Sequence, residues 1–234
     1  MNARAYLSDI LPRVIGYRLA RAGLIPPPPP MTLTLSVTNR CQSRCFTCRI
    51  WQLYRDHPER VAEELAPAEI EAIFRSLGHV YFFNISGGEP YLRADLPEIV
   101  ALGLRHLRPG VVHIPTNGLA PERVEEGTRR ILEHIAALRR PVPLTVKPSL
   151  DDIGERHDRI RGVPGNFERV LDTLARLKRL RERYPNLHVE VGTVVSTANM
   201  HHLDEIAAFV HGLDVESYRN EIAEQRAEFF NRGD

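Results

Sequence analysis

Residues 32–48 read TLTLSVTNRCQSRCFTC, a strand-like run that leads into all three cysteines of the 234-residue chain. Cys41, Cys45 and Cys48 are separated by three and two residues. A four-iron cluster normally takes one cysteine per iron, so three thiolates would hold a [4Fe-4S] cluster with one iron open to another ligand. A closed structural zinc site requires four ligands, usually in two separated pairs. The spacing therefore favours a metal centre that binds a small molecule.

The cysteine spacing alone leaves two alternatives open. Zinc could bind the three thiolates and His57, which would make the protein a non-catalytic metal-binding module on a barrel scaffold. The thiols could also be buried side by side by chance. Iron content and colour after anaerobic purification distinguish a cluster from zinc.

A second motif closes the next apolar run, residues 80–85. It is Ser86-Gly87-Gly88-Glu89-Pro90. Two glycines allow a sharp turn and a close approach of the backbone to a ligand. The carboxylate that follows can accept charge-assisted hydrogen bonds from an amine. The alternative is an ordinary turn with a solvated glutamate.

Three further segments follow in order along the chain. They are TNG at 116–118, PSLDD at 148–152 followed by HDRIRG at 157–162, and TVV at 193–195. Together with the cysteines and the Gly-Gly-Glu turn, they resemble the radical S-adenosylmethionine (SAM) superfamily, in a subgroup similar to MoaA and SPASM-type core domains. The resemblance covers roughly residues 31–215.

Apolar runs and helical patterns alternate from residue 31 onward. Strand-like runs lie at 32–37, 80–85, 111–114, 144–146, 189–195 and, weakly, 215–218, and helical patterns at 67–77, 95–107, 121–138, 166–184 and 203–213. This alternation predicts an α/β fold with parallel strands, as a barrel or a doubly wound sheet. The resemblance selects a partial TIM barrel, the (β/α)6 radical SAM core. We also expect Asn166 to cap its helix.

The sequence divides into two parts. Residues 1–30 predict an amphipathic helix and a linker of five prolines, and residues 31–234 the radical SAM core, which we interpret as truncated at its C-terminus. We expect the helix to dock on the outside of the domain, and the alternative is an interfacial membrane anchor. No run is long enough to span a membrane.

Composition limits the partners. The net charge of +1 gives no field of one sign that would attract nucleic acid, and clustered, unpaired cysteines indicate a reducing, cytoplasmic location. The resemblance implies a small-molecule or peptide substrate and an electron donor such as flavodoxin or ferredoxin. The substrate itself, a peptide, lipid or cofactor precursor, is not identified.

The resemblance implies a role for each motif. The cysteines would ligate the [4Fe-4S] cluster, and SAM would chelate the open iron and be cleaved reductively to a 5′-deoxyadenosyl radical that abstracts hydrogen from substrate. The residues implied to bind SAM are Gly87, Gly88, Glu89, Asn117, Ser149, Arg161 and Thr193. No catalytic side chain is assigned.

Several side chains have more than one interpretation. Arg161 could form a surface ion pair with Asp158, and Asn117 could belong to a simple turn. Asp151 is expected to brace its loop. Lys147 should face the barrel interior, where we favour an ion pair with Glu190 over a substrate anion.

The aromatic residue that many relatives place before the third cysteine is absent, because Thr47 stands there. Phe46 precedes it, and we expect Trp51 to pack over the cysteine loop. His113 and His188 are expected to be hydrogen-bonded structural residues, and no histidine is assigned as a ligand.

Overall fold

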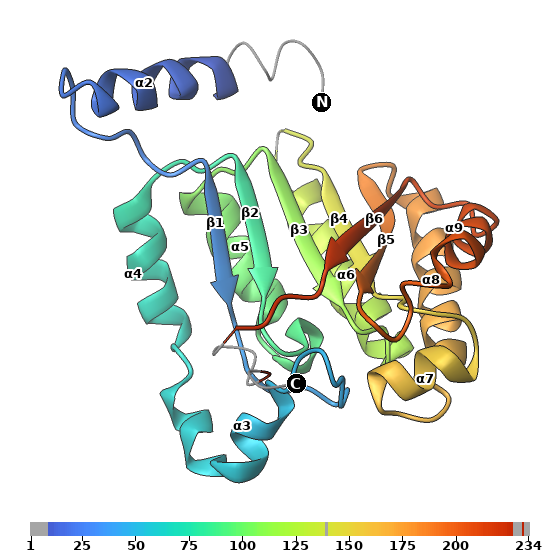
Figure 1. Ribbon diagram of the computed structural model, residues 1–234. Helices are drawn as coiled ribbons and strands as arrows, with labels where there is room; N and C mark the ends of the chain where they lie inside the picture. Colours follow the sequence, from blue (N-terminus) through green and yellow to red (C-terminus); the bar gives the residue numbers. More distant parts are fainter. Residues whose placement is uncertain (1–8, 139, 227–230, 232–234) are drawn as a thin grey trace.

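Six parallel strands form the centre of the structure. The computed structural model describes residues 9–138, 140–226 and 231. The strands are β1 (Thr32–Ser36), β2 (Phe82–Ser86), β3 (Val111–Thr116), β4 (Leu144–Pro148), β5 (Leu187–Val195) and β6 (Ser217–Ile222). They pair in chain order, each parallel to the next, so the sheet curves into a partial TIM barrel (Figure 1).

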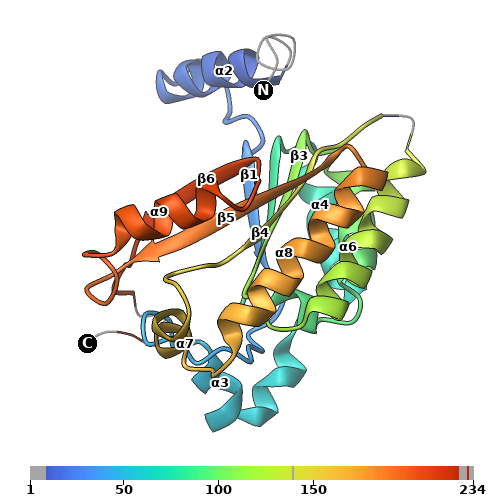
Figure 2. The ribbon, with the colours of Figure 1, turned by 90° about the vertical axis from the view of Figure 1, so that its right-hand side faces the viewer.

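Helices connect the strands and cover one face of the sheet. They are α2 (Leu11–Arg21), α3 (Trp51–Asp56), α4 (Pro67–Leu77), α5 (Leu96–His106), α6 (Pro121–Ala136), α7 (Glu155–Arg161), α8 (Asn166–Arg183) and α9 (Leu203–His211), with 3-10 turns η2 (Pro58–Glu63) and η3 (Pro90–Leu92). Helix α5 packs against α4 and α6, and α6 packs against α8 (Figure 2). Strands joined by helices in this way place all their carboxyl ends at one rim.

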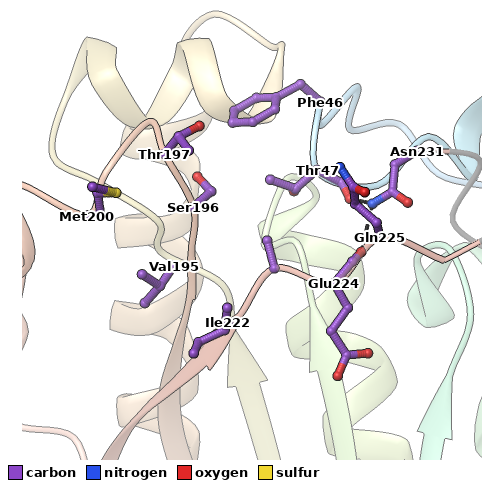
Figure 3. A pocket seen from close by; sticks show the side chains of 11 residues that line it. Phe46, Thr47, Val195, Ser196, Thr197, Met200, Ile222, Glu224, Gln225 and Asn231 are labelled. Atoms are coloured by element: carbon purple, nitrogen blue, oxygen red, sulfur yellow. Dashed lines mark hydrogen bonds between the residues drawn. The ribbon is translucent and has the colours of Figure 1, made fainter. Parts of the chain in front are cut away.

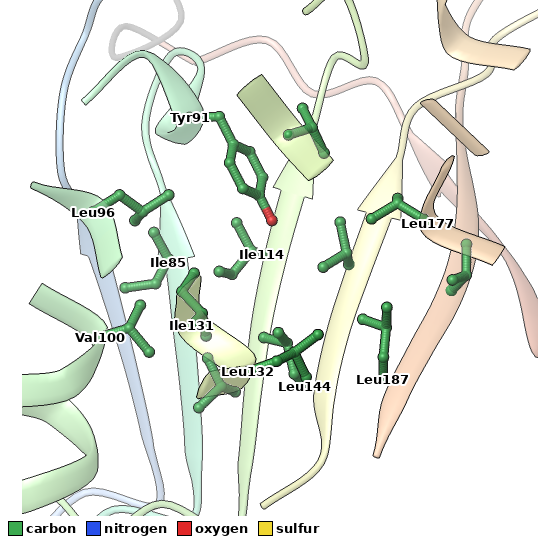
Figure 4. Packing of buried hydrophobic residues seen from close by; sticks show 14 of the residues in the cluster. Ile85, Tyr91, Leu96, Val100, Ile114, Ile131, Leu132, Leu144, Leu177 and Leu187 are labelled. Atoms are coloured by element: carbon green, nitrogen blue, oxygen red, sulfur yellow. The ribbon is translucent and has the colours of Figure 1, made fainter. Parts of the chain in front are cut away.

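The core lies between the sheet and these helices. Phe83, Ile85, Ile114 and Val146 are fully buried, and Figure 4 shows Ile85 and Ile114 facing the helix residue Ile131. Because successive side chains alternate between the two faces of a strand, the strand residues that lie between these buried positions point to the barrel interior. Burial of each such side chain contributes about 1.5–3 kcal/mol to folding, so the core holds the rim in place.

The predicted elements are confirmed with small shifts of their ends. The helix at 67–77 has the predicted bounds, while β4 continues to Pro148 and β6 begins at Ser217 and runs to Ile222. The short helices α3 and α7 were not predicted, because six or seven residues show too little periodicity.

The predicted cap of α8 is wrong. Gly165, at φ 73°, occupies the N-cap position and Asn166 is the first helical residue. The Asp158 carboxylate accepts hydrogen bonds from the backbone N–H groups of Gly165 (2.6 Å) and Phe167 (2.8 Å). The Asp158 side chain, from the preceding helix, therefore caps the N-terminus of α8, which was the role expected of Asn166.

Helix α2 lies beyond the amino ends of the strands, at the opposite end of the barrel from the cysteine loop (Figure 1). The helix is outside the domain, as predicted, but none of its residues is buried. Among the described residues, no helix is long and apolar enough to cross a membrane.

Candidate functional site

The cysteine loop follows β1 at the carboxyl rim of the barrel. Cys41, Cys45 and Cys48 line one cavity of about 160 Å³. The other lining residues come from the cysteine loop itself, from the ends of β2, β3 and β4 and from α7, and they are Ser43, Ile50, Gly87, Gly88, Pro90, Pro115, Thr116, Asn117, Ser149 and Arg161. Motifs that are up to 120 residues apart in the chain therefore share one cavity.

The two glycines after β2 hold the cysteine loop at close range. A Cβ atom on Gly87 would lie 2.2 Å from the Thr38 carbonyl oxygen, and one on Gly88 would lie 2.3 Å from that of Arg40. Gly88 N–H donates to Thr38 O and Glu89 N–H to Arg40 O, both at 2.7 Å. Any larger residue at either glycine would displace the loop, which gives the Gly-Gly pair a packing role besides access to a ligand.

A second contact holds the other side of the loop. The Arg44 N–H donates to the Arg161 carbonyl at 2.8 Å. Gly162 ends α7 with φ 67°, and a Cβ there would lie 2.5 Å from the Arg44 carbonyl oxygen. The Arg-Gly pair after α7 thus fixes the middle of the cysteine loop.

The three thiols share an environment that opposes ionisation. Burial, with the nearby Cys45 and Glu89, raises the pKa of the Cys41 thiol to about 12, and burial raises the pKa of Cys45 and of Cys48. Two donors point at the sulfurs: Asn117 Nδ2 is 3.6 Å from Cys41 Sγ, and Arg161 Nη1 is 3.8 Å from Cys45 Sγ. A cationic metal centre would stabilise the thiolates that burial disfavours.

The zinc alternative can be compared with the positions of the side chains that it requires. Within the described residues, no three His, Cys, Asp or Glu side chains converge closely enough for one metal ion. A cluster instead takes each cysteine on a different iron. His57, the proposed fourth zinc ligand, is absent from the cavity lining and lies 3.4 Å from Glu59 with 60% of its side chain exposed. The zinc alternative therefore lacks its fourth ligand.

Glu89 is buried and is not among the residues that line the cavity. Its carboxylate accepts hydrogen bonds from the Thr116 hydroxyl (2.8 Å) and from the backbone N–H groups of Asn117 (2.7 Å) and Tyr91 (3.2 Å). Burial raises its pKa to about 7 despite these donors. Glu89 ties the end of β2 to the end of β3 and positions Asn117, which does reach the cavity.

Arg161 does not form the surface ion pair with Asp158 that was the alternative. It is 8% exposed, and its Nε lies 2.7 Å from Oδ2 of Asp151, which is 1% exposed. Asp151 also accepts a hydrogen bond from Val194 N–H at 2.8 Å. The structural role expected for Asp151 is therefore confirmed, and its partner Arg161 reaches the Cys45 sulfur.

Ser149 and Thr193 occupy different positions. Ser149 follows directly after β4 and lines the cavity. Its backbone N–H donates a hydrogen bond to Thr116 O at 2.9 Å. Thr193 is buried outside the cavity, where its hydroxyl donates to Leu150 O at 2.5 Å and accepts from the Tyr218 hydroxyl at 3.0 Å. Thr193 thus joins β5 to β6 and to the end of β4.

An apolar pocket of about 350 Å³ adjoins the other side of the cysteine loop (Figure 3). Phe46 and Thr47 form its loop wall, and Val195, Met200 and Ile222 lie across from them. The remaining lining residues are Ser196, Thr197, Ala223, Glu224, Gln225 and Asn231. Trp51 lines neither this pocket nor the cysteine cavity, although its neighbour in the chain, Ile50, lines the cavity. The Trp51 ring instead lies 4.7 Å from the Arg55 guanidinium.

The predicted pairing of Lys147 with Glu190 is wrong. Lys147 Nζ lies 2.8 Å from Glu221 Oε1 on β6, and Glu190 pairs with Arg219 at 3.1 Å. The weak strand signal at 215–218 ended before Glu221, so this partner was missed. His113 Nδ1 lies 2.7 Å from Asn84 Oδ1. Because an amide oxygen can only accept, His113 is the donor of this hydrogen bond. His113 is therefore hydrogen-bonded within the protein, as expected.

The pH dependence of stability should reveal a buried neutral histidine behind the site. Asp151 N–H donates to His157 Nδ1 at 3.0 Å, and burial, with Arg161 nearby, lowers the His157 pKa to about 4. The neutral form therefore contributes stability that is present above pH ~6.5 and is lost as the pH falls towards 4, by about 1.4 kcal/mol per unit. Chemical denaturation of the metal-free protein between pH 7 and 5 measures this slope.

Two glutamine variants provide the control for this slope. Burial, with Lys147 nearby, also lowers the His113 pKa to about 4, so His113→Gln and His157→Gln should each remove a similar share of the slope. An unchanged slope in His157→Gln would show that folding does not lower the His157 pKa.

Known proteins match this chain over most of its length. The model of the radical SAM superfamily matches residues 35–210. A mycofactocin maturase, MftC, of Mycolicibacterium smegmatis is 30% identical over 76% of this chain and 41% of its own length. A probable GTP 3′,8-cyclase of Archaeoglobus fulgidus is 35% identical over 42% of this chain and 31% of its own length. The chain thus spans less than half the length of these curated relatives.

Solved structures share the fold. SuiB of Streptococcus suis, solved with S-adenosylmethionine bound, superimposes with a TM-score of 0.62 at 14% identity, over 97% of this chain and 54% of SuiB. The protein anSMEcpe, solved with AdoMet and a peptide, gives a TM-score of 0.61 at 18% identity over 83% of this chain and 51% of its own. At these identities the likeness concerns the fold.

Proposed function

The chain belongs to the radical SAM superfamily, and we propose that it holds a [4Fe-4S] cluster on Cys41, Cys45 and Cys48 and cleaves SAM reductively at that cluster. Members of this family use a [4Fe-4S] cluster and SAM. When both are bound, they would supply a 5′-deoxyadenosyl radical for hydrogen abstraction, with methionine as the other product of the one-electron cleavage of SAM. The observation that carries the proposal is the single cavity that all three thiols share with the ends of β2, β3 and β4.

We assign the methionine part of SAM to the cysteine cavity. The Gly87–Gly88 backbone and the Asn117 amide would contact its polar end, and Glu89 would act by holding Asn117 in place. Ser149 would offer a hydroxyl, and Arg161 a cationic group near a carboxylate, although its charge is shared with Asp151. Thr193 would act indirectly, by fixing the end of β5.

We assign the adenine to the apolar pocket beside Phe46 and Thr47. This pocket starts from the loop residues between Cys45 and Cys48, so one loop would serve the cluster and the base. Its aromatic and aliphatic lining suits a flat ring, and backbone groups such as the Thr47 carbonyl, which accepts from Asn231 Nδ2 at 2.7 Å, lie at its edge.

The substrate would lie against the interior residues one layer deeper in the barrel than the rim. Asn84 and His113 pair in register and each precede a rim residue by two positions, which places them about 7 Å deeper in the barrel, whereas Lys147 pairs with Pro115 at the level of the cavity lining. This layer is polar, so it suits a substrate with hydrogen-bonding groups, which we take to be a peptide, lipid or cofactor precursor. We propose that a flavodoxin or ferredoxin supplies the electron and that the enzyme is cytoplasmic.

The electron paramagnetic spectrum of the reduced cluster tests this proposal. We expect the anaerobically reconstituted chain to show a cluster spectrum that changes when SAM is added, because the open iron gains a ligand. A sample given the same counter-ion and ionic strength without SAM is the control. A spectrum that does not respond to SAM would disprove SAM binding at the cluster.

Replacement of Glu89 by Gln should weaken SAM binding and leave the iron content unchanged. All three neighbours of the carboxylate donate hydrogen bonds, so the amide NH2 of Gln would face a donor and displace Asn117. We expect a loss of about 1–3 kcal/mol, the cost of an unsatisfied buried group. Titration calorimetry on reconstituted samples measures it, with Glu190→Gln, a buried carboxylate deeper in the barrel, as the control. Equal affinities would show that Glu89 does not position Asn117 for SAM binding.

A further inference from the structure

Helix α2 contacts the rest of the protein through one polar face. Arg13 donates to Pro30 O (3.1 Å) and to His79 O (2.9 Å), and the Tyr17 hydroxyl donates to Pro29 O (2.7 Å). On the same face, a Cβ on Gly16 would lie 3.4 Å from the Pro28 ring. The proline segment therefore supports the helix along the face that carries residues 13, 16 and 17.

The opposite face of α2 is apolar and exposed. Leu11, Ile15 and Leu19 follow one another at four-residue intervals, so they form one stripe along the helix. Ile15 is 49% exposed and Leu19 38%, while Leu24 (69%) and Ile25 (41%) extend the apolar surface into the following turn. No residue of α2 is buried in the described structure. We call this surface, residues 11–25, the α2 surface.

The segment that carries the α2 surface has an excess of basic over acidic residues. Residues 1–30 hold four of the 31 basic residues of the chain and only one of its 30 acidic residues, so the rest of the chain is slightly acidic. Arg18 and Arg21 are exposed; Arg18 lies beside the apolar stripe at i+3 from Ile15, and Arg21 follows Arg18 by one turn at the end of the helix. No acidic residue occurs between Ile10 and Pro30.

We propose that the α2 surface binds the headgroup region of a membrane that contains anionic lipid. An apolar stripe flanked by arginines is complementary to such a surface, where aliphatic side chains enter the acyl boundary and guanidinium groups meet the phosphates. The 11-residue helix is about 16 Å long, so it would lie flat on the bilayer. This interaction goes beyond the proposed SAM chemistry and does not depend on it.

The position of the α2 surface leaves the reaction site free. Figures 1 and 2 show α2 at one end of the barrel and the cysteine loop at the other. The five prolines, Pro26 to Pro30, form a stiff spacer, because each fixes its backbone φ near −65° and cannot continue the helix. A membrane-bound α2 would therefore hold the barrel with its carboxyl rim facing the solvent.

Vesicle flotation of the full chain tests this proposal. We expect binding to phosphatidylcholine vesicles that contain phosphatidylglycerol and little binding to phosphatidylcholine alone, with affinity falling as salt rises. The double variant Ile15→Asp/Leu19→Asp should reduce binding by more than about tenfold, since charged groups replace the apolar stripe. Arg18→Gln and Arg21→Gln should each reduce it by about fivefold.

Matched variants elsewhere separate α2 from the general surface. Ile73→Asp on α4, at a position that is 36% exposed, and Arg105→Gln on α5 should bind vesicles like the unmodified chain. Failure of the unmodified chain to float with anionic vesicles, or equal binding by Ile15→Asp/Leu19→Asp, would overturn the proposal. A lipid-free dimer that Leu19→Asp dissociates would also overturn it, by showing that a second copy covers this face.

Discussion

Replacement of Cys45 by Ala is expected to reduce the iron content of the reconstituted chain from about four atoms to nearly none. All the cysteines of the chain lie within residues 41–48, so no second cluster can retain part of the iron. Cys45 is the most buried of the three thiols and lies beside Arg161, so no water or neighbouring donor can readily replace its sulfur. Iron and sulfide analysis after anaerobic reconstitution measures the effect.

Ser43→Ala is the matched control for this variant. It removes one heavy atom from the same loop, and the Ser43 hydroxyl is buried without a hydrogen-bond partner among the described residues. We expect Ser43→Ala to keep its iron and Cys45→Ala to keep its fold, because the core lies on the other side of the sheet. Half the iron retained in Cys45→Ala, or eight atoms in the unmodified chain, would contradict a single cluster on these cysteines.

Replacement of Arg161 by Met should lower the free energy of unfolding of the metal-free protein by about 3–5 kcal/mol. The substitution leaves the Asp151 carboxylate buried without its cation, 2.7 Å from where the guanidinium was. Removal of one partner from a buried ion pair costs far more than the pair itself contributes, because the remaining charge stays desolvated. Denaturant unfolding of the metal-free chain measures the loss.

A double variant identifies the cause of this loss. In Arg161→Met/Asp151→Asn the neutral amide can still accept from Val194 N–H, so the double variant should be more stable than Arg161→Met alone. Arg159→Met, which removes a 68% exposed arginine from the same helix, should cost less than about 1 kcal/mol. If the double variant is as unstable as the sum of the single variants, the ion pair does not explain the loss.

The sequence predicted the fold because its signals are local and repeated. The apolar runs of the strands and the helical patterns between them alternate, and neither needs knowledge of distant contacts. The resemblance was needed to choose a barrel over a flat sheet. Short segments such as α7 escaped prediction, since one polar turn carries almost no periodic signal.

The site was predictable in its residue types and not in its contacts. The cysteines, the Gly-Gly pair, Asn117, Ser149 and Arg161 meet in one cavity, as the motifs suggested. Glu89 and Thr193 are buried beside that cavity without lining it. The sequence could not reveal this, because the alternation of side chains between the two faces of a strand no longer holds where the strand ends in a turn. The Lys147–Glu221 and Arg161–Asp151 pairs join distant segments, so only the folded chain identifies them.

Formation of 5′-deoxyadenosine from SAM is the most direct test of the central claim. The anaerobically reconstituted chain, given SAM and a strong reductant, should form 5′-deoxyadenosine and methionine in equal amounts even without substrate, because this chain itself supplies the three cysteines, the residues assigned to the methionine part of SAM and the pocket assigned to its adenine. Cys45→Ala should form neither product. A chain that holds one cluster and binds SAM yet releases no 5′-deoxyadenosine would contradict the proposed function.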